Sequence, residues 1–330
     1  MTTNENKKIK GKKLKIKNVN VVWITKTDLT NLNSGEGGTN YTDIKKYEEG
    51  GIEKPYVSGQ AMRFYLKSAI RRNNDKIFCV MDEKGNTCMN IEKCNLCDLF
   101  GFMKPDSADI RVSPVKVSPA MGQLPADGNT TDDLLLRFRP GTSHDMPTVE
   151  LGLNIYKCGI SIDCIRVGAV EENEKQRGAY VPPFTSLIDG NEKLKRIQEV
   201  IDAVEFITDA SKQSRLMTDF TPDIVIITFQ NKYSHRLQKA LKVEIKEENG
   251  NKKAILNKKL LEDTLTEIKP FTDKMFIGIK EGIVDNIDEI KTVLEKFDYD
   301  EKTPKTPKTP FEALELAKDA CTDENFFEHT

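Results

Sequence analysis

The chain has 330 residues, 31% of them charged, and a formal net charge of −2, so it is long enough for one elaborated domain or two. It contains no run of about 18 apolar residues, and its lysine-rich first 17 residues lack the apolar core of a signal peptide, so we expect a cytoplasmic protein with no membrane partner. The net charge conceals a basic segment, since residues 1–72 carry 15 Lys and Arg against 7 Asp and Glu whereas residues 280–330 carry 7 against 14, and this predicts an anionic partner.

The first half of the chain is expected to open with a strand, a long loop and a helix. Residues 14–25 become almost continuously apolar, which indicates a central strand. Residues 31–51 are rich in Gly, Asn, Glu and Lys without a period, and this predicts a loop. An amphipathic helix is expected over 59–72, after a short strand. Residues 73–150 are irregular, and we expect them to form an insertion outside the main sheet.

The second half mixes strand and helix patterns. Residues 149–170 alternate at period two, which predicts strands or a hairpin, and the β-branched run over 223–229 predicts a buried strand. The other expected elements are a helix over 191–207, a helix over 262–269, a strand over 275–279, a helix over 285–297, an extended Lys-Thr-Pro linker over 302–310 and a short helix with a frayed acidic end over 311–330. This mixture predicts an α+β fold with a small sheet and large insertions, such as a ferredoxin-like core.

Four of the seven cysteines cluster with the spacing C-x8-C-x5-C-x2-C; they are Cys79, Cys88, Cys94 and Cys97. The last two lie on one tight turn, as tetrahedral zinc requires, so the cluster predicts one structural zinc ion. The alternative is a set of buried thiols. An odd number of cysteines argues against a disulfide framework. Cys158 and Cys164 are six residues apart in a strand-like run, so we expect both to face the core.

The predicted helix over 59–72 has the clearest functional pattern. Arg63, Lys67 and Arg71 are spaced i, i+4 and i+8, and they therefore stack on one side of the helix. The free N–H groups and the positive dipole end of a helix N-terminus suit a phosphate, and a basic stripe extends such a site along a polyanion. The pattern favours binding of a nucleic-acid backbone; its alternative is a solvated helix face.

Two loops offer further phosphate contacts. Residues 31–40 are rich in glycine and short polar groups, whose backbone N–H groups can approach phosphates closely. Lys212, Ser214 and Arg215 lie just before the strand that starts near Asp223, and such side chains suit sugar-phosphate contacts. The alternatives are a flexible surface loop and ordinary loop solvation. None of the three histidines has a serine or cysteine partner at a recognisable spacing, so a catalytic triad is unsupported.

The order of these motifs is informative. A hydrophobic first strand leads to an Asn/Gly-rich loop, then Val57-Ser-Gly-Gln60 opens a basic helix, a cysteine pair runs into Asp98-Leu-Phe-Gly101, and Lys212-x-Ser-Arg215 precedes a β-branched strand. In this order the motifs resemble the backbone subunit of the CRISPR surveillance complex Cascade, in the Cas-seven or DevR family of the RAMP superfamily, most like type I-B. The resemblance spans residues 14–300.

The resemblance implies a modified RRM-like palm with a finger insertion and a thumb hairpin. Copies would polymerise head to tail in an open arc, and each would hold guide RNA while base pairing reads the target DNA. The implied organisation is a first palm part over 14–72, a finger insertion with the cysteine cluster over 73–164, a thumb region over 165–205, a second palm part over 206–300, and the linker and acidic tail over 301–330. The thumb tip is expected at Val181 or Phe184.

The resemblance also implies the residues that contact RNA, and it implies a subunit that is not an enzyme. These residues are Ser58, Gln60, Arg63 and Lys67 at the helix, Asn33 and Asn40 in the adjacent loop, and Lys212, Ser214 and Arg215 on the other side. Its partners would be CRISPR RNA, target DNA, other copies and other Cascade subunits. One alternative is a metal-dependent RNA endonuclease of a type III-like RAMP complex, which would use Asp43 or Glu36. Another is a transcriptional autoregulator, although the sequence has no helix-turn-helix pattern.

Overall fold

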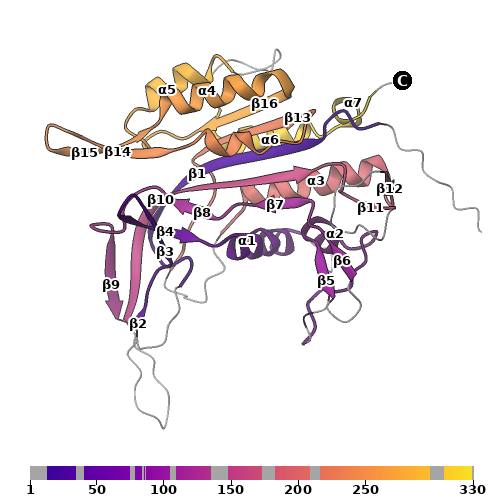
Figure 1. Cartoon of the computed structure of the whole chain (residues 1–330), viewed down its shortest axis with the longest axis horizontal. Coiled ribbons are helices and arrows are strands. Elements are labelled where there is room, and N and C mark those ends of the chain that lie inside the picture. Colours follow the sequence, from indigo (N-terminus) through magenta and orange to yellow (C-terminus); the bar gives the residue numbers. More distant parts are fainter. Residues whose placement is uncertain are drawn as a thin grey trace, which may run out of the picture.

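One large sheet with helices on both faces forms the centre of the molecule (Figure 1). The computed structural model describes residues 13–34, 41–74, 79–83, 85, 87–104, 109–134, 148–172, 183–208, 216–297 and 308–328. Within these residues, seven strands of the sheet follow one another in the order β16 (Thr272–Ile279), β13 (Ile224–Gln230), β1 (Asn18–Thr30), β10 (Thr148–Asp163), β8 (Ala120–Gly122), β4 (Ile52–Val57) and β3 (Lys46–Glu49). Three more strands pair with β10, namely β2 (Tyr41–Thr42), β7 (Val115–Val117) and β9 (Thr130–Leu134). All of these pairings are antiparallel except the one between β2 and β10.

Strand β1 lies at the centre because its apolar side chains fill both faces of the sheet. Val21 and Trp23 belong to the core on one face, whereas Val22 and Ile24 belong to the core on the other. The strand pairs with β10 on one side and with β13 on the other. The predicted central first strand is therefore confirmed, and so is the buried strand β13.

Strand β10 pairs with several short strands that the sequence pattern did not predict. It has 16 residues, and β7, β8 and β9 pair with successive parts of it. The expectation that residues 73–150 lie outside the main sheet is therefore wrong. Strands of three to five residues carry too few alternations to produce a periodic signal. Cys158 and Cys164 are fully buried in the core that also contains Val21 and Trp23, so both face the core as expected.

Helices from different parts of the chain cover the two faces. On one face lie α1 (Gly59–Arg72), α3 (Gly190–Glu205) and α6 (Pro310–Asp319), and on the other lie α4 (Lys258–Ile268) and α5 (Ile287–Leu294) (Figure 1). These helices confirm the predicted helical segments. Helix α3 packs beside α1, so this part of the expected thumb region belongs to the main layers. None of the described helices is both long and apolar enough to span a membrane.

Three small hairpins and some short turns complete the described part of the chain. They are β5 (Phe102–Lys104) with β6 (Asp109–Arg111), β11 (Ala169–Glu171) with β12 (Phe184–Ser186), and β14 (Val243–Glu248) with β15 (Asn251–Leu256). Two short helices, α2 (Asn95–Phe100) and α7 (Asp323–Phe326), and two 3₁₀ turns, Arg236–Lys239 and Lys269–Phe271, connect the larger elements. Phe184 lies at the start of β12, whereas Val181 lies outside the described residues.

The C-terminal segment is part of the fold, which corrects the expectation of a frayed acidic end. Phe326 is fully buried, and its ring centroid lies 5.0 Å from that of Phe229 on β13. The backbone N–H of Lys15 donates to the carbonyl of Phe326 at 2.8 Å. Ahead of α6, the N–H of Ile279 on β16 donates to the carbonyl of Lys308 at 2.8 Å. Most of the predicted Lys-Thr-Pro linker lies outside the described residues.

Candidate nucleic-acid interface and metal centre

The start of α1 is joined to the Asn/Gly-rich loop that precedes it. Ser58 is the N-cap residue, and its hydroxyl accepts a hydrogen bond from the N–H of Ala61 at 3.2 Å. Its own N–H donates to the side-chain oxygen of Asn33 at 2.8 Å. Gln60, in the first turn, is exposed. The structure therefore brings together three of the predicted site residues, and it gives the Ser58 hydroxyl a capping role as well.

The basic stripe on α1 faces the cysteine insertion instead of open solvent. Arg63 and Lys67 are half-buried, and their charged groups lie 5.7 and 5.5 Å from the ring centroid of Phe100. Arg63 also donates to the carbonyl of Phe100 and, at 3.1 Å, to the hydroxyl of Ser113. Burial lowers the pKa of both side chains, and the neighbouring cations lower the pKa of Lys67 further. These two residues thus hold the insertion against α1, which the spacing in sequence did not predict.

Arg71 extends this attachment to the last turn of α1, whereas Arg72 contacts the segment after α3. Arg71 donates to the carbonyl of Cys79 at 3.1 Å. Arg72 donates to the hydroxyl of Thr208 at 3.1 Å, and Thr208 is the last described residue before the Lys212 block. The predicted residues Asn40, Lys212, Ser214 and Arg215, together with the alternative candidate Glu36, lie outside the described residues.

The four clustered cysteines converge on one point. All four sulfur atoms lie within 4.8 Å of one another, and Cys79 Sγ lies 3.4 Å from the sulfur atoms of both Cys94 and Cys97. Tetrahedral zinc with Zn–S bonds of about 2.3 Å separates its sulfur ligands by about 3.8 Å, so the quartet has the size and donor set of a structural zinc site. Hydrogen bonds from Cys97 and the other thiols lower the pKa of Cys94 to about 4, which favours a thiolate there.

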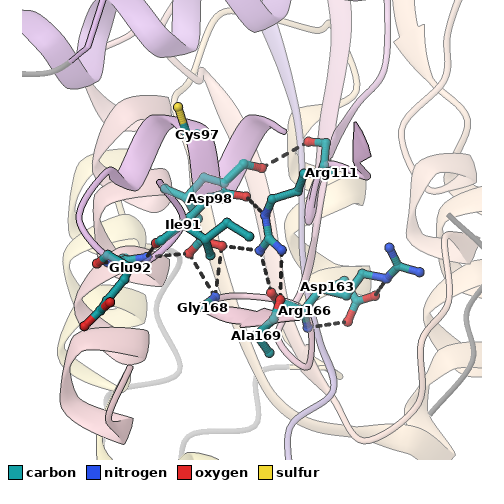
Figure 2. A network of polar contacts seen from close by, with 12 residues as sticks. Ile91, Glu92, Cys97, Asp98, Arg111, Asp163, Arg166, Gly168 and Ala169 are labelled. Carbon is teal, nitrogen blue, oxygen red and sulfur yellow. Dashed lines mark hydrogen bonds and ion pairs between the residues drawn. The ribbon is translucent and has the colours of Figure 1, made fainter. Parts of the chain in front are cut away.

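A buried carboxylate next to the cluster ties it to the core (Figure 2). Asp98 is fully buried, and it accepts hydrogen bonds from Arg111, from Arg196 at 2.7 Å and from the N–H of Gly168 at 2.9 Å. Arg196 on α3 also donates to the carbonyls of Ile91 and Glu92, at 2.7 and 2.6 Å. Both carbonyls belong to the stretch between Cys88 and Cys94, so one guanidinium fixes the backbone of the ligand loop.

Arg111 completes the network from the β6 strand. It donates to the backbone carbonyls of Asp98 at 2.9 Å, Arg166 at 2.8 Å and Ala169 at 2.8 Å (Figure 2). The backbone of Arg111 lies close to Gly101, and only glycine permits this: Gly101 has a φ of +69°, and a Cβ there would lie 2.3 Å from the carbonyl oxygen of Arg111. The sequence pattern identified Asp98 and Gly101 as parts of a motif. It gave no signal for Arg111 or Arg196, since their partners are distant in sequence.

The sequence also matches a known family. Residues 24–249, more than half of the chain, match the family described as CRISPR-associated negative auto-regulator DevR/Csa2. The chain belongs to the DevR/Csa2 family. The resemblance expected from the motif order is thereby confirmed at the level of the family. A comparison with curated proteins finds no match.

Solved structures share the architecture of this DevR/Csa2 chain. A chain of a structure titled "CRISPR RNA-guided surveillance complex" has 15% identity and a TM-score of 0.53, and the comparison covers 92% of this chain and 100% of that one. A second, titled "CRISPR RNA-guided surveillance complex, pre-nicking", has 11% identity, a TM-score of 0.52 and the same coverage. At these identities the likeness establishes a common mixed α+β fold with a large antiparallel sheet.

Proposed function

We propose that this protein is a non-catalytic subunit of a CRISPR RNA-guided surveillance complex and that it holds the sugar-phosphate backbone of the guide RNA. The observation that carries the proposal is the junction of Asn33 with Ser58 at the start of α1, in a chain of the DevR/Csa2 family. The junction puts Asn33, in the described part of the Asn/Gly-rich loop, beside a helix N-terminus and the exposed Gln60. Backbone contacts of this kind hold RNA without reading its sequence, which leaves the bases free to pair with target DNA.

The fold supports an RRM-like palm as the framework for this contact. The chain order β1, α1, β7, β10, α3, β13 is the β-α-β-β-α-β order of a ferredoxin-like unit. An RRM stacks bases on the exposed face of its sheet, but here α4 and α5 cover that face, and Val22 and Ile24 are fully buried beneath them. We therefore infer that guide RNA contacts the α1 side of the palm and does not lie on the sheet.

We also assign the finger and the thumb that the family resemblance implies. In this proposal the cysteine insertion with β5 and β6 is the finger, and the β11–β12 hairpin is the base of the thumb. Copies contact one another head to tail along the RNA, beside other subunits of the complex. A type I-B complex is the expected setting.

We infer further that Cys79, Cys88, Cys94 and Cys97 hold one structural zinc ion. The donor set and the sulfur spacing fit this metal. A zinc ion would fix the insertion next to α1, because the carbonyl of Cys79 accepts from Arg71. Its role would be structural, since four thiolate ligands leave no position open for a substrate.

The competing hypothesis is a metal-dependent RNA endonuclease that uses Asp43 or Glu36, of which Glu36 lies outside the described residues. Metal-assisted cleavage of RNA requires ligands that converge on the ion. Among the residues with described positions, the cysteine quartet is the one group of three or more potential ligands that converge, and Asp43 belongs to no such group. Incubation of the assembled complex with complementary RNA and magnesium should leave the RNA intact, whereas periodic cuts that disappear in Asp43→Ala would favour the endonuclease.

The proposed function is tested by the nucleic acid that accompanies the purified protein. Protein expressed together with a CRISPR array should carry RNA of one uniform length that derives from the array. Recovery of heterogeneous RNA, or of no nucleic acid at any salt concentration, would contradict the proposal.

A further inference from the structure

A basic and aromatic turn lies on the surface directly after β13. Residues 231–239 carry three cations and no acidic residue. Tyr233 and His235 are both exposed, and their rings meet edge to face with centroids 4.9 Å apart and an interplanar angle of 64°. The Tyr233 hydroxyl lies 3.0 Å from Nε2 of His235. The two rings thus form a fixed corner that faces solvent.

Two buried amides hold this turn in place. The side-chain N–H groups of Asn18 and Asn20 donate to the same carbonyl, that of Ser234, at 2.8 and 3.0 Å. Both asparagines are fully buried on the face of β1 that also carries Val22 and Ile24. Buried amides cost stability unless they are hydrogen-bonded, and aliphatic residues would fill this face without that cost. The position of the two amides is explained if the exposed turn must be rigid.

A glycine on β10, Gly159, leaves space for the other end of the turn to pack against the strand. A Cβ at Gly159 would lie 2.0 Å from the side-chain oxygen of Gln238, so Gln238 lies directly on the strand. Glycine within a strand commonly marks a close approach of this kind. The turn is therefore fixed at both Ser234 and Gln238, with Tyr233 and His235 at its exposed side.

Cations connect the turn with the start of α1. Lys116 on β7 is exposed, and burial together with the charge of Lys116 lowers the pKa of His235, which favours a neutral ring. Burial and the charges of Arg166 and Arg63 lower the pKa of Lys116 in turn. Strand β7 ends beside the N-terminus of α1, where a Cβ on Gly59 would lie 3.4 Å from the carbonyl oxygen of Val117. A single strand that leaves the α1 contact can therefore reach the turn across β7.

We propose that the turn over residues 231–239 is a second binding site, for single-stranded nucleic acid, in which the Tyr233–His235 corner stacks unpaired bases. The phosphates of the strand lie against Lys116, Lys232 and Lys239, which are exposed. Aromatic platforms flanked by cations bind single strands without sequence preference, because every base has a π-face. This site goes beyond the proposed backbone contact at α1, since it engages bases. The strand is either RNA or DNA, as the stacking chemistry is shared.

The test uses the full chain freed of nucleic acid and two labelled homopolymers of about 15 nucleotides, oligo(U) RNA and oligo(dT) DNA. Fluorescence anisotropy should show that Tyr233→Ala with His235→Ala weakens binding of at least one oligonucleotide by about tenfold or more. Tyr233→Phe keeps the stacking face and should bind within about twofold of wild type. Phe311→Ala removes an aromatic side chain that is 56% exposed on α6, and it is the matched control that should leave both affinities unchanged.

The outcomes separate this inference from the proposed function. Loss of RNA binding alone identifies RNA as the stacked strand, loss of DNA binding alone identifies DNA, and loss of both identifies a shared site. Unchanged affinity of the Tyr233→Ala, His235→Ala protein for both oligonucleotides would overturn the inference. If Gln60→Glu on the exposed first turn of α1 then still lost RNA binding, the proposed backbone contact would stand without this second site. Photocrosslinking of 4-thiouridine RNA or 4-thiothymidine DNA should place the adduct within residues 231–239.

Discussion

Arg196 on α3 donates a 2.7 Å hydrogen bond to the carboxylate of Asp98 on α2, and neither side chain is more than 1% exposed. The same guanidinium holds the carbonyls of Ile91 and Glu92 in the cysteine loop. A helix of the main layer and the cysteine insertion are therefore parts of one cooperative unit. Breaking such a network leaves the remaining charges buried without a partner, which is more costly than the loss of an exposed ion pair.

Asp98→Ala should lower the free energy of unfolding by about 3–5 kcal/mol, because Arg111 and Arg196 would keep buried charges without their carboxylate. Urea denaturation followed by circular dichroism measures this change. Glu267→Ala is the matched control, since its ion pair with Arg236 is 2.9 Å long and about 60% exposed, and it should cost less than about 1 kcal/mol. Equal effects of the two substitutions would contradict the assigned role of Asp98.

Elemental analysis of the purified protein should give about one zinc per chain, because four thiolates saturate a tetrahedral site. Cys94→Ser with Cys97→Ser should abolish the bound zinc and lower the melting temperature. Cys321→Ser changes a buried thiol outside the cluster and should retain the metal. Zinc bound at wild-type stoichiometry by the double variant would place the metal elsewhere.

Glu205 at the end of α3 should make stability depend on pH below neutrality. Lys318 on α6 contacts its carboxylate at 2.5 Å, yet burial raises the pKa of Glu205 from 4.5 to about 7. Between these values the folded protein binds a proton that the unfolded chain releases, so the contribution of Glu205 to stability is full below pH 4.5 and is lost as the pH rises through about 7. The expected loss is about 1–3 kcal/mol.

Glu205→Gln should remove this dependence and should be more stable than wild type at pH 8. Thermal denaturation between pH 4.5 and pH 8 compares the two proteins over the relevant range. Asp319→Asn, on an exposed position of α6, is the control that should keep the wild-type profile. A profile of Glu205→Gln that runs parallel to wild type would show that another group causes the dependence.

Phe326→Ala should destabilise the protein by about 3–5 kcal/mol, because the ring is fully buried against Phe229 in the main core. Phe311→Ala, on the exposed side of α6, should change stability by less than about 1 kcal/mol. Chemical denaturation of both variants measures the difference. Equal stability of the two would mean that the C-terminal segment contributes little to the fold.

Sequence patterns predicted the helices and strands whose apolar residues recur with a clear period. They did not predict contacts between residues that are far apart in the sequence. Helix α1 occupies Gly59–Arg72 as expected, because its apolar and basic residues define two faces. The spacing of Arg63 and Lys67 showed that they share a side of α1, but it did not show that Phe100 lies against that side. Recognition of that contact requires the tertiary structure.

The same distinction holds for the candidate sites. The cysteine quartet followed from its spacing in sequence, whereas the family resemblance placed Asn33 in the loop near α1 without predicting its hydrogen bond with Ser58. Arg196 gave no such signal, since its partner Asp98 is 98 positions away. The core role of Phe326 was hidden because acidic residues surround it in a segment with a short helix.

The central claim is tested most directly by the guide RNA that an α1 variant retains. Arg63 and Lys67 are unsuitable for this purpose, because both contact Phe100 and hold the cysteine insertion against α1. Gln60→Glu places a negative charge on the exposed first turn of α1, and Lys259→Glu on the exposed side of α4 is the control. After expression with a CRISPR array and purification at equal salt, the control should carry the RNA and the α1 variant should bind it about tenfold or more weakly while remaining folded. Equal RNA content and equal affinity in the two proteins would contradict the account.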